Sequence, residues 1–130
     1  MVAVGKRRVK RNGEVNEAEE IFESAAIIAK KDGEIVGYIH CDRNGRDDIA
    51  GVDFFLILGK DLFLPIQVKT YVNKTHNEQK LREHLQRHPD VTSVIFIDTT
   101  AKTEKESEKV IAEVRREIRV FIKAFKSRFA

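Results

Sequence analysis

Three polar side chains stand inside segments that otherwise have the pattern of buried strands, and their types fit the chemistry of phosphate esters. They are Asp53, Gln67 and Lys69, in the stretch GVDFFLILGKDLFLPIQVKT at residues 51 to 70. A carboxylate and an amide oxygen are ligands of the hard kind that Mg²⁺ takes. A lysine beside them can orient or deprotonate an attacking water, or stabilise charge that builds on a phosphate. The three residue types together fit metal-dependent hydrolysis of a phosphodiester.

The spacing of these residues brings them to one patch if the two strands form a hairpin. Side chains alternate between the faces of a strand, so Gln67 and Lys69 point the same way. A three-residue loop between the strands pairs Leu58 with Leu62. The same register sets Asp53 directly opposite Gln67, with Cβ atoms about 5 Å apart. A slip of one residue would put the two side chains on opposite faces.

The rest of the chain predicts the elements that must position this hairpin. A helix is expected over NEAEEIFESAAIIAKKDG, with Asn16 as its N-cap and Gly33 at its end, followed by a strand EIVGYIHC. After the hairpin come a helix over about residues 74 to 87, a buried strand VTSVIFID and a last helix over about residues 105 to 129. The order αβββαβα predicts an α/β fold with a mixed central sheet and helices on both sides, because the second helix can cross between parallel strands.

Composition restricts the class of protein further. With 130 residues, 42% hydrophobic and 35% charged, the chain fits a single domain over residues 1 to 130. One cysteine excludes an internal disulfide and a metal site built from several cysteines. No apolar run approaches the roughly 18 residues of a membrane span, and the first residues lack the apolar core of a secretion signal. We therefore expect a cytoplasmic protein without membrane contact.

The element order, with GVD on one strand and QVK on the next, resembles the PD-(D/E)xK nuclease superfamily. This restriction endonuclease-like family includes archaeal Holliday junction resolvases and many DNA repair and restriction enzymes. The resemblance covers nearly the whole chain as element order, but its specific motif is short. It implies a three-layer α/β/α fold and an endonuclease that hydrolyses DNA with Mg²⁺ or Mn²⁺ and no small-molecule cofactor. Branched or otherwise structured DNA is a candidate substrate.

The resemblance also implies a role for each polar residue of the hairpin. Asp53 and Gln67 would bind the metal together with the backbone carbonyl of Val68, and Lys69 would be the catalytic ammonium. The family has an acid in the place of Gln67, so one negative charge is missing and metal affinity should fall. A second hypothesis therefore stays open, a nucleic-acid-binding or assembly module on this fold with weak or no cleavage. Asp53 also has a structural interpretation, a buried or edge carboxylate paired with Lys69.

Many members of the family add a glutamate from the first helix. Glu17 lies at the border of the apolar stripe of this helix, whereas Glu20 lies further out. Glu17 is therefore the first choice, although the length of the helix counted back from Gly33 suits Glu20 better. Acids in the first turn of a helix are also stabilised by the helix dipole without any further role.

Basic residues are clustered on a chain whose formal net charge is only +3, and clusters of this kind attract a phosphate backbone. The last helix carries several, for which a solvated face laced with acids is an equal alternative. A nuclease that cuts two strands generally needs two active sites, so we expect a homodimer built on the last or the second helix. The residues expected to bind nucleic acid are Lys6, Arg7, Arg8, Lys10 and Arg11 of a flexible basic arm at residues 1 to 13, and Lys74.

Overall fold

The computed structural model describes residues 16–41 and 51–128, which form an α/β arrangement of three helices and a four-stranded sheet. The sheet order is β1-β2-β3-β4, with β3 and β4 parallel and the other pairs antiparallel. The predicted element order and the mixed sheet are confirmed. The elements are α1 (Glu17–Lys31), β1 (Gly37–His40), β2 (Phe54–Gly59), β3 (Leu62–Thr70), α3 (Lys74–Arg87), β4 (Val94–Ile97) and α4 (Glu104–Ser127).

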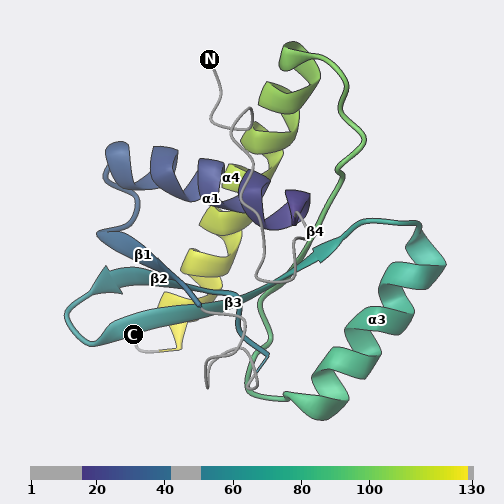
Figure 1. Cartoon of the computed structure of the whole chain (residues 1–130). Coiled ribbons are helices and arrows are strands. Elements are labelled where there is room, and N and C mark those ends of the chain that lie inside the picture. The colour runs from purple at the N-terminus through teal and green to yellow at the C-terminus, as the bar shows by residue number, and fades with distance from the viewer. Residues whose placement is uncertain (1–15, 42–50, 129–130) are drawn as a thin grey trace.

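Helices α1 and α4 cross each other over one face of the sheet and bury its core there (Figure 1). Both begin at the residue types expected of an N-cap: the Asn16 side chain accepts from the Glu19 backbone N–H, and Thr103 forms a capping box with Glu106. Their apolar stripes meet alternate side chains of the strands, as the two periodicities require. The core includes Phe22 and Ala25 of α1, Ile111, Val114 and Ile118 of α4, and Phe54, Leu56, Leu64, Ile66, Val68, Ile95 and Ile97 of the sheet.

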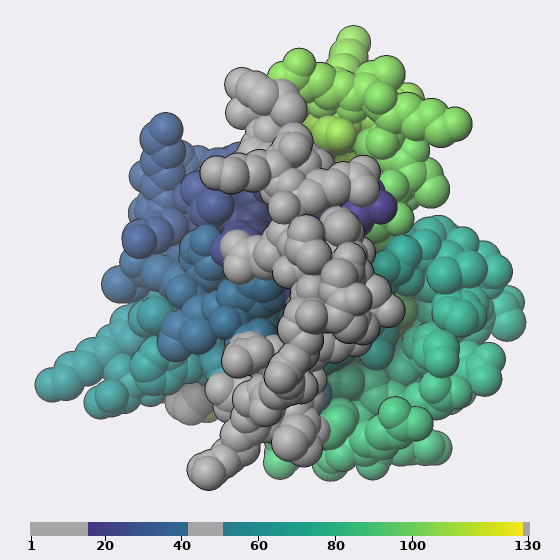
Figure 2. All heavy atoms as spheres, viewed as in Figure 1, coloured from purple at the N-terminus to yellow at the C-terminus, as the bar shows by residue number. Residues whose placement is uncertain are grey.

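Helix α3 lies apart from α1 and α4, beside the end of β3, and forms the opposite side of the molecule from α1 and β1 (Figures 1 and 2). Its buried side chains, Asn77 and His84, are both polar. Asn77 Oδ1 accepts from the Val72 backbone N–H at 3.1 Å, and His84 Nε2 donates to the Val91 carbonyl at 2.8 Å. The leucines of α3 are only half-buried. Among the described residues, the fully buried contacts of this helix are therefore polar.

The β2–β3 hairpin differs from the predicted one in its turn but keeps the predicted register. Gly59 pairs with Leu62, so the predicted pairing of Leu58 with Leu62 is wrong. The turn is shorter by one residue because Asp61 takes a positive φ of 60°, and an irregularity between Ile57 and Gly59 absorbs the extra residue. Further along, residues 54 to 57 of β2 pair with residues 63 to 66 of β3 in the expected register.

Two expectations concern segments or properties beyond these elements. The basic arm predicted at residues 1 to 13 lies outside the described residues. Among the helices that the structure describes, none has the length and apolar character needed to cross a membrane. The expected location in the cytoplasm stays a prediction.

Candidate functional site

Asp53 lies at the point where β2 separates from β3, one residue before β2 begins. The residue is buried, with 9% of its surface exposed. The backbone N–H of Asp53 donates to the Ile66 carbonyl at 2.8 Å, and its Oδ2 accepts from the Val68 N–H at 2.8 Å. The pairing of β3 with β2 ends at Ile66, so no backbone carbonyl of β2 accepts from the buried N–H of Val68. The carboxylate of Asp53 accepts this hydrogen bond instead. The carboxylate is thereby held beside the residue that separates Gln67 from Lys69.

Gln67 and Lys69 lie on the face of β3 that is turned away from α1 and α4, because Ile66 and Val68 point into the core. Both are half-buried, and both line a cavity of about 220 Å³ between β3 and α3. Parallel pairing with β4 starts at Gln67, whose N–H donates to the Ser93 carbonyl at 3.0 Å. The two side chains predicted to act together therefore open into one cavity.

The ammonium of Lys69 interacts electrostatically with the charged side chains around the cavity. Burial lowers the pKa of Lys69 from its usual value, and the carboxylate of Asp53 acts in the opposite sense. The nearby charges of Lys80 and Arg87 on α3 lower this pKa further. A lysine with a lowered pKa beside a carboxylate, in a cavity, is the combination often found at functional sites.

The glutamates of α1 fall in different surroundings. Glu17 is exposed at the first position of the helix, whereas Glu20 is buried. Glu19, which the sequence analysis did not select, is also buried, and its Oε1 lies 2.7 Å from His40 Nε2. The His40 ring stacks on Phe54 with centroids 4.4 Å apart. Because Phe54 directly follows Asp53, the Glu19–His40 pair lies at the same end of β2, on the side of α1.

A sequence signal for this pair existed in two periodicities. Glu19 and Glu23 are one helical turn apart, and Tyr38 and His40 are two residues apart on a strand, so each pair shares a face. The structure joins the two pairs residue by residue. His40 contacts Glu19, and the Tyr38 hydroxyl donates to Glu23 Oε2 at 2.9 Å. Only the packing of α1 on β1 shows that the two faces meet.

The oxygen donors of this site fit a divalent cation in part. A carboxylate offers about four lone-pair positions, so the hydrogen bond from Val68 is compatible with a metal ligand role for Asp53. Within residues 16–41 and 51–128, no three His, Cys, Asp or Glu side chains gather as a metal cluster. A cation would depend on Asp53, the Gln67 amide oxygen and the Val68 carbonyl, which is a set with little negative charge.

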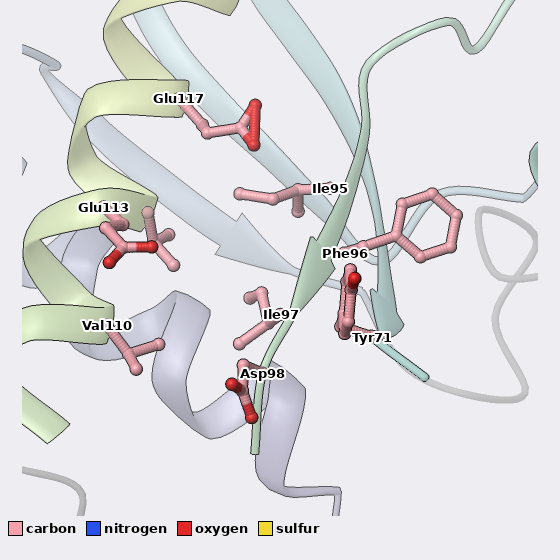
Figure 3. A pocket seen from close by; sticks show the side chains of 9 residues that line it. Tyr71, Ile95, Phe96, Ile97, Asp98, Val110, Glu113 and Glu117 are labelled. Atoms are coloured by element: carbon pink, nitrogen blue, oxygen red, sulfur yellow. The ribbon is translucent and has the colours of Figure 1, made fainter. Parts of the chain in front are cut away.

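A larger cavity of about 360 Å³ lies between α4 and β4, away from the predicted site residues. Figure 3 shows Glu117 and Glu113 reaching into it from α4, while Asp98 stands at the end of β4. Burial raises the pKa of Glu117. This cavity combines carboxylates with apolar side chains such as Ile95, so it is unfavourable for a phosphate.

The basic residues of α4 are used partly for structure. Arg115 Nη2 lies 2.8 Å from Asp32 Oδ2 and 3.0 Å from Glu34 Oε1, and Arg119 Nε lies 2.5 Å from Glu34 Oε2. These ion pairs tie α4 to the segment between α1 and β1. Lys74 is exposed at the start of α3. The five basic residues of the predicted arm lie outside the described residues.

No protein-family model, no curated protein and no solved structure matches this chain. The resemblance to the PD-(D/E)xK nucleases accordingly stays a proposal. It rests on the element order and on Asp53, Gln67 and Lys69.

Proposed function

We propose that the protein is a metal-dependent endonuclease of the PD-(D/E)xK kind, with a three-layer restriction endonuclease-like fold, that hydrolyses phosphodiester bonds of DNA. The observation that carries the proposal is the 2.8 Å hydrogen bond from the Val68 N–H to Asp53 Oδ2. It holds a carboxylate next to the residue between Gln67 and Lys69, and these two side chains open into one cavity. The carboxylate also acts electrostatically on the ammonium of Lys69, which supports a joint role of the three side chains.

Each residue has a separate task in the proposed reaction. Bound Mg²⁺ or Mn²⁺ supplies a nucleophile at neutral pH and neutralises charge on the phosphate. Asp53 and Gln67 would hold the cation with their side-chain oxygens, and the Val68 carbonyl would be the third protein ligand. Lys69 orients the attacking water or stabilises the charge that develops on the phosphate oxygens. The acid that the first helix would add to the site is Glu17 or Glu20. Glu20 is buried, whereas Glu17 is exposed.

The test is cleavage of plasmid and branched DNA by the purified protein with Mg²⁺ or Mn²⁺, and with EDTA. We expect metal-dependent nicking that Lys69→Ala lowers by about 10²-fold or more. The matched control is Lys109→Gln, which removes one positive charge at an exposed position of α4. Cleavage that needs no metal, or that Lys69→Ala leaves unchanged, would disprove the proposed site.

Gln67 allows a direct test of the metal ligands. Gln67→Glu adds a carboxylate of nearly the same length and shape, so it should strengthen Mg²⁺ binding, because hard cations prefer anionic oxygen. Gln67→Leu should abolish binding while the fold is retained, since the side chain is turned away from the core. Calorimetric titration of Mg²⁺ or Mn²⁺ into the wild type and both variants measures these affinities. Equal affinities would mean that Gln67 is a structural residue.

A second function, a nucleic-acid-binding or assembly module on this fold without efficient cleavage, is favoured by the structural use of Asp53. Its carboxylate satisfies the Val68 N–H, a role that a protein without cleavage activity would also need. The replacement of the family's second acid by Gln67 points the same way. DNA binding without metal-dependent cleavage on any substrate, with Lys69→Ala equal to the wild type, would decide for this function.

A further inference from the structure

The cavity between β3 and α3 is lined by basic side chains from two elements. Lys69 comes from β3, and Lys80 and Arg87 come from α3. Positions 80, 84 and 87 share one face of the helix because of its 3.6-residue period. This face of α3 lies toward β3, where a helix normally presents apolar side chains.

The described walls of this cavity carry three cations and one carboxylate. The carboxylate, Glu83, lies 3.4 Å from the ammonium of Lys80. Lys80 lowers the pKa of Glu83, so this acid stays ionised and offsets one of the cations. The charges of Lys80 and Arg87 also act on Lys69, whose pKa they lower. The cations thus stand close enough to repel one another, and an anion between them would relieve this repulsion.

The cavity is fixed in position by polar contacts on the same helix. His84 is buried, and its Nε2 donates to the Val91 carbonyl at 2.8 Å. The ring of His88 lies directly over Gly51, two residues before Asp53. Helix α3 is therefore anchored both to the segment before β4 and to the segment before β2. The helix positions that carry Lys80 and Arg87 are consequently fixed relative to the segment before β2.

We propose that this cavity binds a backbone phosphate of DNA next to the phosphodiester that is cleaved, with Lys80 and Arg87 as its ligands. The proposal rests on the proposed function, because Lys69 is shared between the cavity and the reaction site. The guanidinium of Arg87 suits a phosphate, which it can bind through two parallel hydrogen bonds. The carboxylate-lined cavity between α4 and β4 would repel the same group. The backbone should therefore run along the α3 side of the molecule.

A neighbouring phosphate would make the enzyme prefer a polynucleotide to a small phosphodiester. Binding energy from a part of the substrate that does not react can be used to orient the part that does. A diester without a second phosphate, such as bis(p-nitrophenyl) phosphate, cannot use Lys80 and Arg87. Its hydrolysis should depend on the proposed reaction site, which is formed by Asp53, Gln67, the Val68 carbonyl and Lys69.

The test compares Lys80→Gln and Arg87→Gln with the control Lys109→Gln. Both cavity positions are exposed enough for a neutral residue to be accepted, and urea unfolding verifies that stability is kept. Fluorescence anisotropy of a DNA duplex in EDTA measures binding without catalysis. We expect Arg87→Gln to weaken binding by about tenfold and to lower the slope of log affinity against log salt by about 1. Hydrolysis of bis(p-nitrophenyl) phosphate with Mn²⁺ should change much less than DNA affinity in both variants, because the two cations reach this reaction only through their effect on Lys69.

The outcomes separate this inference from the proposed nuclease function. Loss of DNA affinity in EDTA, specific to the cavity variants, supports the phosphate site even if the protein cleaves nothing. Equal affinities of the cavity variants and Lys109→Gln, or no DNA binding by the wild type, overturn the inference. Inorganic phosphate is a second probe, because a cavity built for a free anion would bind it. Binding of inorganic phosphate that is tighter than binding of the duplex would also overturn it.

Discussion

At the scale of single residues, Asp53 combines a structural role with a proposed chemical one. Its carboxylate satisfies the buried N–H of Val68 where the hairpin opens, and its charge acts on the ammonium of Lys69. These roles depend on different properties of the side chain. The hydrogen bond needs an acceptor of the right length, whereas the electrostatic effect and metal binding need a negative charge.

Two substitutions of Asp53 should separate these roles. Asp53→Asn keeps an oxygen acceptor for the Val68 N–H and removes the charge, so we expect loss of metal-dependent activity at a cost of at most about 1 kcal/mol in stability. Asp53→Ala leaves the donor without this acceptor and should cost about 1–3 kcal/mol. Urea unfolding and metal-dependent cleavage measure the two effects. Equal stability of the two variants would show that the hydrogen bond is unimportant.

The lowered pKa of Lys69 predicts the pH dependence of activity. If the ammonium form acts, cleavage should fall as pH rises through the pKa of the folded protein, which lies below the usual value of about 10.4. Lys69→Arg keeps a positive charge at every accessible pH, so its profile should lack this alkaline fall. Rates measured between neutral pH and pH 10 decide between the two forms. A rise in wild-type activity over this range would indicate that the neutral amine acts as a base.

The same pKa shift affects stability with a definite sign. Between the lowered pKa of the folded state and the usual value, the unfolded state binds more protons at Lys69. The free energy of unfolding should therefore gain a contribution from Lys69 that increases as pH rises through this window. Lys69→Met should remove that contribution, and chemical unfolding at several pH values measures the difference.

At the scale of elements, the contact between the end of α3 and the segment before β2 positions the site. Gly51 has a φ of +81°, and a Cβ there would come within 2.5 Å of the His88 ring. Gly33 has nearly the same φ, +80°, but a Cβ there would meet nothing within 4 Å. The two glycines thus share a backbone requirement, and only Gly51 adds a steric one.

Alanine at these two glycines should have different effects. Gly33→Ala should cost about 1–2 kcal/mol, the strain of a left-handed conformation. Gly51→Ala should cost more and should also lower activity, because a displaced His88 or backbone would move Asp53. Adding His88→Ala to Gly51→Ala should recover the steric part only, which a double-mutant cycle in urea measures. Equal losses at the two glycines would rule out the contact with His88 as a positioning element.

At the scale of the whole molecule, the proposed endonuclease raises the question of how a second strand is cut. Two-fold symmetric dimers are the commonest way for a small protein to provide two sites. The outer side of α4 carries Val120, which is 59% exposed. Other positions of this helix, such as Arg115 and Arg119, already contact the segment after α1. Val120 is therefore a marker for an interface on α4.

We expect the protein to be a homodimer at micromolar concentration, measured as its mass by light scattering. If α4 forms the interface, Val120→Glu should shift the mass toward the monomer, because it places charge in an apolar contact. A dimer that resists this substitution would direct attention to α3. A monomeric wild type would contradict the prediction and would favour single-strand nicking.

Much of the fold follows from local patterns that the sequence contains. Helical stripes, the Asn16 cap and alternating strand residues predict the observed element order. The bounds of α3 agree with the expected residues 74 to 87. Local signals suffice here because periodicity and capping act within a few residues along the chain. The predicted turn of the hairpin was too long by one residue. The positive φ of Asp61 allows a tighter turn than the predicted three-residue loop.

The site shows where sequence reasoning reaches its limit. Register alone brought Asp53, Gln67 and Lys69 together in the prediction, because alternation on two paired strands is a local rule. The hydrogen bond to Val68, the burial of Glu19 against His40 and the basic cavity under α3 were decided by the tertiary structure. Each of these three features joins segments that are distant in sequence, so it depends on how the elements pack together. The periodicity of a single element cannot predict that packing.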